Sequence, residues 1–242
     1  MNTPSNARLR MGAALGTAGL IVLAAGGCGG AANTHGSAGS AAVSAAPAAK
    51  VLTGTKLKSL LLPASAMPKG FRLNADGARD TGDSVAPSSS SPVAPRKVCG
   101  MLMQTSWIQA AGIGSATFAQ NDYGNAGHTD QVAQEIDTYH GNDAQKTMSG
   151  LRKAFAGCTA FTDKSSGVTA KVKLVRSPLR GAGDEGIKVV GTSPTWQGGM
   201  TLVAVRVGNA VVTTFYSASG HDKGAAAVKM AESLAKKVQS AS

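Results

Sequence analysis

The sequence has few aromatic and few acidic side chains. Aromatic residues make up 4% of its 242 residues, and 13 Asp and Glu stand against 24 Lys and Arg, a formal net charge of +11. Such a charge can serve nucleic-acid binding, but no DNA- or RNA-binding motif is present and few rings are available to stack on bases. We therefore expect no nucleic-acid partner. Anionic lipid headgroups or wall polymers are alternative neighbours, and a contribution to solubility explains the charge equally well.

Motifs of known enzymes are also missing. Neither G-x-S-x-G nor H-E-x-x-H occurs, and His128, His140 and His221 do not have the spacing of metal ligands. Residues 181–186 fit G-x-G-x-x-G, but a strand pattern follows where a dinucleotide site needs a helix, so this stretch predicts a tight turn. We expect a protein that is not an enzyme and that holds no cofactor and no metal.

No apolar run is long enough to span a membrane comfortably. Residues 11–27 are uncharged and follow a basic start, but they are few and rich in Gly and Ala, a layout typical of an export signal. The Ala-Gly-Gly-Cys segment that ends at Cys28 resembles the lipobox of bacterial lipoproteins, although Ala25 stands where Leu is usual. We predict a signal peptide at 1–27 and lipid attachment at Cys28. An ordinary secretory signal and a retained helix are the alternatives.

Residues 28–50 consist almost entirely of small residues, which cannot bury enough apolar surface to fold. We predict that they form a flexible tether. Diacylglycerol and further acyl chains such as palmitate would then anchor the protein to the cell membrane on its extracytoplasmic face. Loss of residues 1–27 removes two Arg and no acid, so 22 basic and 13 acidic residues would remain, a net charge of +9.

Cysteine is scarce, with three residues in the chain. If Cys28 carries lipid, Cys99 and Cys158 remain, and an exported domain with two cysteines favours a disulfide bond between them. In the chain-entropy model a bond closing a loop of about 60 residues stabilises the fold by about 4 kcal/mol. A reactive thiol or a metal site is the alternative, but no C-x-x-C pair supports it.

Residues 51–242 are expected to form one α+β domain with an antiparallel sheet flanked by helices. The clearest element is a hairpin at 201–216, where Gly208-Asn209 is a two-residue turn that pairs Val205 with Val212 and Leu202 with Phe215. Other strand patterns cover 116–123, 132–139, 171–175 and 187–190. Helical patterns cover 57–62, 143–156 and the chain from about residue 222 onward.

The hairpin is apolar on both faces, whereas two packing helices need only one. We therefore expect the other face to line a cleft for a small apolar or amphipathic molecule, with Trp196 at the rim and a floor formed by Leu202, Ala204, Val211, Thr213 and Phe215. The alternative is that helix 143–156 covers this face.

Three further features carry expectations. Residues 74–97 show no apolar periodicity and predict a mobile loop, either a lid over the cleft or a surface insertion. Trp107 is expected in the core. Arg206 interrupts the apolar pattern near the turn, which favours a solvated strand end over an anion site.

The order of these features resembles a known family. A "LLPASAMPKGF" opening, Cys99 followed by Trp107, a helix that ends in Cys158, the Gly-Asp-Glu turn at 183–185 and the "VAVRVGNAVV" hairpin together resemble the PknH-like extracellular sensor domain of actinobacterial lipoproteins and receptor kinases. The chain also resembles LpqN-type lipoproteins, which are similar to PsbP-like folds. The resemblance implies a cleft and a ligand-sensing role without catalysis. One candidate disulfide stands where the kinase sensor has two, and no kinase is attached, so direct signalling is not implied.

Together these observations predict a monomeric, membrane-anchored lipoprotein with a ligand-binding domain of the sensor type. Its partner would be a small apolar ligand or an envelope protein. The alternatives are a cell-envelope hydrolase without a recognised motif and a structural or partner-docking lipoprotein.

Overall fold

The hairpin forms the centre of the sheet. In this computed structural model, strands β10 (Gly199–Val207) and β11 (Ala210–Ala218) are joined by a two-residue turn in which Gly208 has a φ of 57°. Glycine adopts that conformation without steric cost. Val205 pairs with Val212 and Leu202 with Phe215, so the predicted register is confirmed. The structure describes residues 50–127, 129–164, 167–219 and 224–242.

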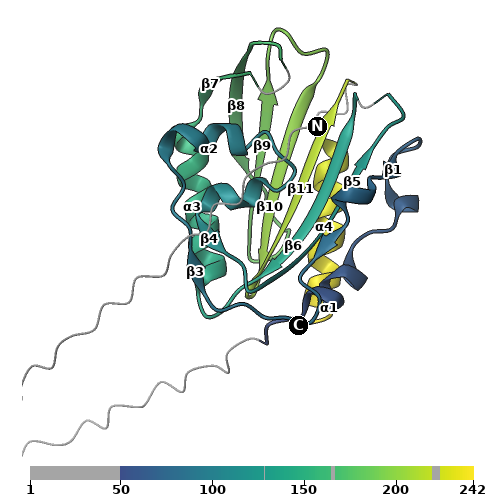
Figure 1. Cartoon of the computed structure of the whole chain (residues 1–242), viewed down its shortest axis with the longest axis vertical. Coiled ribbons are helices and arrows are strands. Elements are labelled where there is room, and N and C mark those ends of the chain that lie inside the picture. Colours follow the sequence, from purple (N-terminus) through teal and green to yellow (C-terminus); the bar gives the residue numbers. More distant parts are fainter. Residues whose placement is uncertain (1–49, 128, 165–166, 220–223) are drawn as a thin grey trace, which may run out of the picture. The chain divides into compact units, whose positions relative to one another are not determined.

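Within the described residues, nine strands form one antiparallel sheet in the order β1-β5-β6-β11-β10-β9-β8-β7, and β2 also pairs with β5 (Figure 1). A separate pair, β3 and β4, forms a second small sheet. The bounds of these strands are β1 Arg72–Leu73, β2 Arg79–Asp80, β3 Ser89–Ser90, β4 Ile113–Gly114, β5 Thr117–Gly124, β6 Gln131–Thr138, β7 Ala160–Asp163, β8 Ala170–Pro178 and β9 Glu185–Thr192.

One face of the sheet, which we call the back face, is covered by α4 (Ala225–Gln239) and α1 (Gly54–Leu60). The buried side of α4 is the apolar stripe expected from the sequence, namely Ala227, Ala231, Leu234 and Val238, none of which is exposed. These side chains contact the back-face residues of the hairpin, such as Val203 and Val212. The closing helix is therefore a packing helix, as its periodicity predicts.

The opposite face, which we call the front face, is covered by α3 (Asp143–Gly157) with the 3₁₀ helix η3 (Trp107–Ala111) and α2 (Pro95–Met101) (Figure 1). Asp143 lies in the first turn of α3, where a negative charge stabilises a helix, and its carboxylate lies 2.7 Å from Lys146 Nζ. The Trp107 side chain is buried with its ring centroid 5.8 Å from that of Phe155. The predicted core position of Trp107 is confirmed.

The segment 74–97 has more structure than its composition predicts. It contains the 3₁₀ helix η2 (Ala75–Gly77), the short strands β2 and β3, and the first turn of α2. Arg79 and Asp80 pair with β5, and Ser89 and Ser90 pair with β4. Backbone hydrogen bonds to β4 and β5 hold this segment. Because such bonds do not depend on the side chains, they produce no apolar periodicity in the sequence. The segment thus contains short regular elements, and its mobility stays a prediction.

The sequence suggested that Arg206 lies at a solvated strand end, and this expectation was wrong. Its side chain is 16% exposed, and its Nη1 donates to Asp184 Oδ2 at 2.9 Å. The same carboxylate oxygen accepts from the backbone N–H of Gly208 at 2.8 Å, so Asp184 holds the hairpin turn. Residues 181–186 form the predicted turn, with left-handed φ values of 78° at Gly181 and 61° at Gly183.

The described residues thus form an α+β unit with helices on both faces of an antiparallel sheet, and the predicted fold class is confirmed. Among these residues, no helix combines the length and apolar character that crossing a bilayer requires. The predicted signal peptide at 1–27, Cys28 and most of the 28–50 tether lie outside the described residues.

Candidate functional site

The residues expected to form the floor of an open cleft lie on the front face, as predicted, but most of them are covered. Leu202, Ala204 and Val211 have no exposed surface and Thr213 is 1% exposed. They lie beneath α3, with apolar side chains of that helix such as Met148 in the same core cluster. The structure therefore shows the alternative stated above, in which helix 143–156 covers this face.

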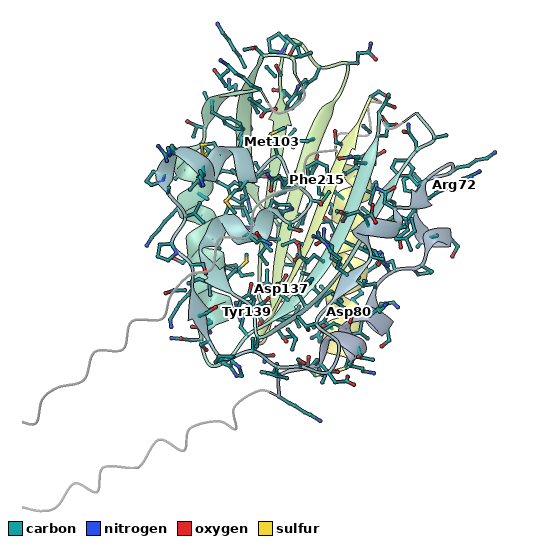
Figure 2. The ribbon with its side chains drawn as sticks, in the orientation of Figure 1. Arg72, Asp80, Met103, Asp137, Tyr139 and Phe215 are labelled. Carbon is teal, nitrogen blue, oxygen red and sulfur yellow. A yellow bond between two sulfur atoms is a disulfide. The ribbon has the colours of Figure 1, made fainter. Side chains whose placement is uncertain are left out.

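Trp196 and Phe215 lie at the edge of this covered region. Together with Met103 and Met200 they line a cavity of about 370 Å³, which we call the tryptophan cavity. Figure 2 shows Met103 and Phe215 near one another toward one end of the sheet. Of the six residues proposed for ligand binding, these two share a cavity.

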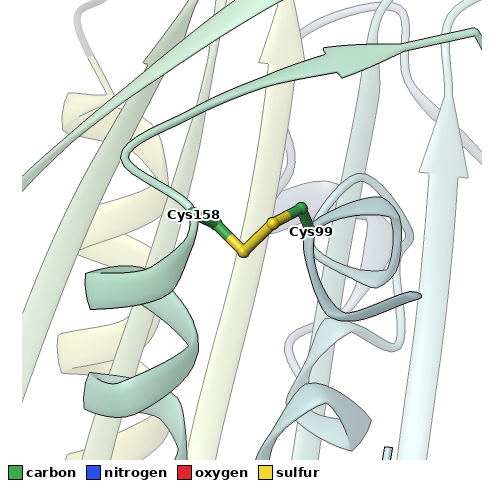
Figure 3. The surroundings of a disulfide bond; sticks show 2 residues. All are labelled: Cys99 and Cys158. Carbon is green, nitrogen blue, oxygen red and sulfur yellow. A yellow bond between two sulfur atoms is a disulfide. The ribbon is translucent and has the colours of Figure 1, made fainter. Parts of the chain in front are cut away.

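A second cavity, of about 400 Å³, lies on the same face above the neighbouring strands β5 and β6. We call it the acidic cavity, because Glu135 and Asp137 of β6 point into it. Its rim and roof come from short elements: β2 with Arg79, η3 with Ile108, β4 with Ile113, and Met101 at the end of α2. The disulfide bond between Cys99 and Cys158 ties α2 to the end of α3 (Figure 3).

The two carboxyl groups are almost completely buried. Glu135 is 4% exposed and Asp137 is 3% exposed. They occupy alternate positions on β6, so both side chains project from the same face of the sheet about 7 Å apart along the strand. Neither Glu135 Oε2 nor Asp137 Oδ2 accepts a hydrogen bond from the described part of the protein. A buried oxygen without a partner is costly, and in native proteins it calls for an explanation.

Hydrogen bonds among other polar residues occupy the nearby donors. Arg79 Nη2 donates to Gln120 Oε1 at 2.9 Å and to Ser106 Oγ at 3.1 Å. The Gln120 amide nitrogen donates to Asp122 Oδ1 at 2.7 Å and to Thr105 Oγ1 at 3.2 Å. This network lies beside Glu135, which pairs with Gln120 across the strands, but it offers Glu135 Oε2 no hydrogen bond.

Burial changes the protonation of both carboxyl groups. Desolvation raises the pKa of Asp137 to about 7, although the Ser115 side chain acts in the opposite direction. Desolvation also raises the pKa of Glu135 well above its usual range, and the charges of Asp137 and Asp122 add to this effect. Each carboxyl therefore opposes ionisation of the other, as expected for two acids in one low-dielectric site.

Sequence reasoning missed this pair, although a signal was present. The strand pattern at 132–139 places Ala133, Glu135, Asp137 and Tyr139 on one face and Ile136 with its neighbours on the other. Two acids at i and i+2 in a strand that is otherwise apolar or neutral indicate buried carboxyls if both faces of that strand are covered. The sequence alone did not indicate that β6 is an interior strand.

The remaining site predictions have different outcomes. The Cys99–Cys158 disulfide is present, with a Cα–Cα distance of 5.4 Å, in agreement with the prediction. His140 Nε2 lies 2.9 Å from the backbone oxygen of Ala86, whereas His128 and His221 lie outside the described residues. No group of three or more His, Cys, Asp or Glu side chains suited to a metal ion occurs in the described ranges.

Comparison with solved structures gives a likeness at the level of fold. No protein-family model matches the chain, and no curated protein matches it. Among solved structures, the chain is similar to the crystal structure of the extracellular domain of PknH from Mycobacterium tuberculosis, with a TM-score of 0.55 and 14% sequence identity. The alignment covers 79% of this chain and 98% of that one. The described domain therefore has a fold like that of the PknH extracellular domain, whereas the resemblance to LpqN-type lipoproteins is untested.

Proposed function

We propose that this chain is an extracytoplasmic lipoprotein, anchored through Cys28, whose domain binds a small ligand in the acidic cavity and does not catalyse a reaction. The observation that carries this proposal is a 400 Å³ cavity into which two buried carboxyl groups project without hydrogen-bond partners for Glu135 Oε2 and Asp137 Oδ2. Ligand sites in proteins are cavities of this size in which a few polar groups converge. The similarity to an extracellular domain supports an extracytoplasmic location.

The export signal and the disulfide bond support the same location. Disulfides persist in oxidising compartments, and Cys99 and Cys158 are joined in this fold. Anchoring through Cys28 can be tested by labelling cells with a radioactive fatty acid. The wild-type chain should incorporate label, and Cys28→Ala should not. Equal labelling of the two proteins, or no label in either, would contradict lipidation.

Ligand binding can be tested by mass spectrometry of small molecules that co-purify with the full chain from its native membrane. Ala86 is an exposed residue on the cavity wall, so Ala86→Trp should obstruct the cavity with little effect on stability. Ala66→Trp is the matched control, because Ala66 is exposed and is not a lining residue of this cavity. We expect a ligand that is retained by the wild type and the control and lost from Ala86→Trp. Equal retention by all three, or none, would overturn the proposal.

One observation favours a second function, an envelope hydrolase. A buried carboxyl pair in which Asp137 has a pKa of about 7 is a typical arrangement for general acid–base catalysis near neutral pH. This candidate corresponds to the cell-envelope hydrolase without a recognised motif that the sequence left as an alternative. Turnover of an envelope glycan or peptide by the pure protein, abolished by Asp137→Asn, would establish it and overturn the non-catalytic proposal.

A further inference from the structure

The unpartnered carboxyl oxygens in the acidic cavity indicate which ligand chemistry it accepts. An oxygen of an ionised carboxyl can only accept hydrogen bonds, so Glu135 Oε2 and Asp137 Oδ2, which have no partner among the described residues, require donors whenever the pair ionises. Arg79 Nη2 and the Gln120 amide nitrogen donate to other groups, as described above. A molecule in the cavity can supply the donors that these two oxygens lack when the pair is ionised.

The charge of the carboxyl pair further limits the class of ligand that the acidic cavity can accept. An anionic ligand would add a third negative charge beside two acids in a low-dielectric site, and a purely apolar ligand would leave both oxygens without partners. A metal ion is disfavoured because the described residues bring two carboxyls together and no third His, Cys, Asp or Glu ligand. An organic cation with several N–H donors satisfies both oxygens and offsets their charge.

The rest of the cavity wall presents apolar side chains that can contact the apolar part of a ligand. Ile108 and Met101 line the roof, Ile113 lies on β4, and Phe118 lies on β5. These side chains offer apolar contact beside the carboxyl pair, at a volume of about 400 Å³ that admits a small organic molecule.

We propose that the acidic cavity binds a small organic cation, with a primary ammonium or guanidinium group hydrogen-bonded to Glu135 and Asp137 and an apolar body against Ile108 and Phe118. This inference rests on the proposed ligand-binding function and specifies the class of ligand. It also assigns the two carboxyls as binding residues.

Binding of this kind is linked to ionisation of the pair. Asp137, with a pKa raised by burial to about 7, is partly protonated near neutral pH, burial raises the pKa of Glu135 as well, and a cation stabilises the ionised form of the pair. Binding should release protons to the solvent, and affinity should rise between pH 5 and pH 8. A neutral ligand would not produce this pattern.

The other charged groups near the pair are few. Arg79 on β2 lowers the pKa of Glu135, and Asp122 on β5 raises it. Tyr139 on β6 has its own pKa raised well above the usual range by burial, so it stays neutral over this interval. Arg206 on β10 lies two strands from Asp137, beyond Val211, and pairs with Asp184. The lining residues from η3 and β4 carry no charge.

The test uses three probes with the same apolar chain and different head groups: hexylammonium, hexanol and hexanoate. The protein is the full chain carrying Cys28→Ala, which removes the proposed acylation site and allows work without detergent. Isothermal titration calorimetry in phosphate and in Tris gives the affinity and the number of protons released. The key variant is Glu135→Gln/Asp137→Asn, which keeps the shape of the side chains. Trp196→Ala in the tryptophan cavity is the control.

We expect hexylammonium to bind with proton release, hexanol to bind more weakly, and hexanoate not to bind. The double variant should lose at least about tenfold in hexylammonium affinity, while Trp196→Ala keeps it. If the double variant does not fold, two other results test the proposal. They are proton release when hexylammonium binds to the Cys28→Ala chain, and loss of hexylammonium affinity in Asp137→Asn alone. Binding of hexanol and hexylammonium with equal affinity and no proton release would refute the cation class and leave the ligand-binding function standing. Binding of none of the probes, together with no co-purified ligand, would overturn both.

Discussion

The two halves of the front face differ, although they belong to one continuous sheet. Above the middle of the hairpin β10–β11, the 15-residue helix α3 brings a regular apolar stripe against Leu202 and Val211, which have no exposed surface. Above β5–β6, the cover consists of short elements, and a cavity of about 400 Å³ remains over Glu135 and Asp137. A long amphipathic helix can close-pack against a sheet along its whole length. Several short segments meet the sheet at separate points and leave room between them.

The disulfide bond between Cys99 and Cys158 joins these two halves, because Cys99 lies in α2 and Cys158 follows α3. Replacing both by Ser should lower the free energy of unfolding by about 4 kcal/mol, since the bond restrains a long loop in the unfolded chain. Urea denaturation measures this loss. The hexylammonium affinity should fall with it, because α2 contributes Met101 to the roof of the acidic cavity. Unchanged stability would mean that α2 is held by other contacts.

A matched pair of methionines measures the difference in packing. Met148 of α3 is completely buried above the hairpin, whereas Met101 of α2 is half-buried beside the cavity. Met148→Ala should cost about 3 kcal/mol because it leaves a hole in a close-packed core. Met101→Ala should cost about 1 kcal/mol, because one side of that residue already faces open space. Equal losses in urea denaturation would show that the two halves are packed alike.

The carboxyl pair should make the stability of the protein depend on pH. The pKa of Asp137 is raised in the fold from 3.8 to about 7, so the folded state favours the protonated form. The resulting stabilisation is complete below about pH 4 and is lost as the pH rises through 7. From Asp137 we expect the unfolding free energy to fall by about 3 kcal/mol between pH 5 and pH 8, and Glu135 adds to this fall. The variant Glu135→Gln/Asp137→Asn should remove most of the change.

Asp80→Asn is the control for this pH dependence. The pKa of Asp80 is lowered by its hydrogen bond with Lys58, so Asp80 stays ionised throughout this interval and the variant should keep the wild-type slope. A flat profile in the wild type would contradict the burial of the pair. Adding hexylammonium should reduce the fall in stability, because the cation stabilises the ionised carboxyls.

The sequence by itself determined much of the architecture. The Gly208-Asn209 turn determined the register of the hairpin, and the apolar spacing of 143–156 and 227–238 determined two packing helices. Short-range patterns of this kind are set by backbone geometry and by side-chain periodicity, so they can be recognised before the fold is known. The pairing of Cys99 with Cys158 followed from the count of cysteines once Cys28 was assigned to lipid attachment and the domain to an oxidising compartment.

Only the tertiary structure decided which surfaces are open. Leu202 and Ala204 are apolar residues that could line either an open cleft or a closed core. Because α3 covers them, they belong to the core. Glu135 and Asp137 read as ordinary strand residues until β5 and β11 on either side of β6, together with the roof of short segments, bury them beside a cavity. Burial and pKa depend on contacts between residues far apart in the sequence, and no local pattern records those contacts.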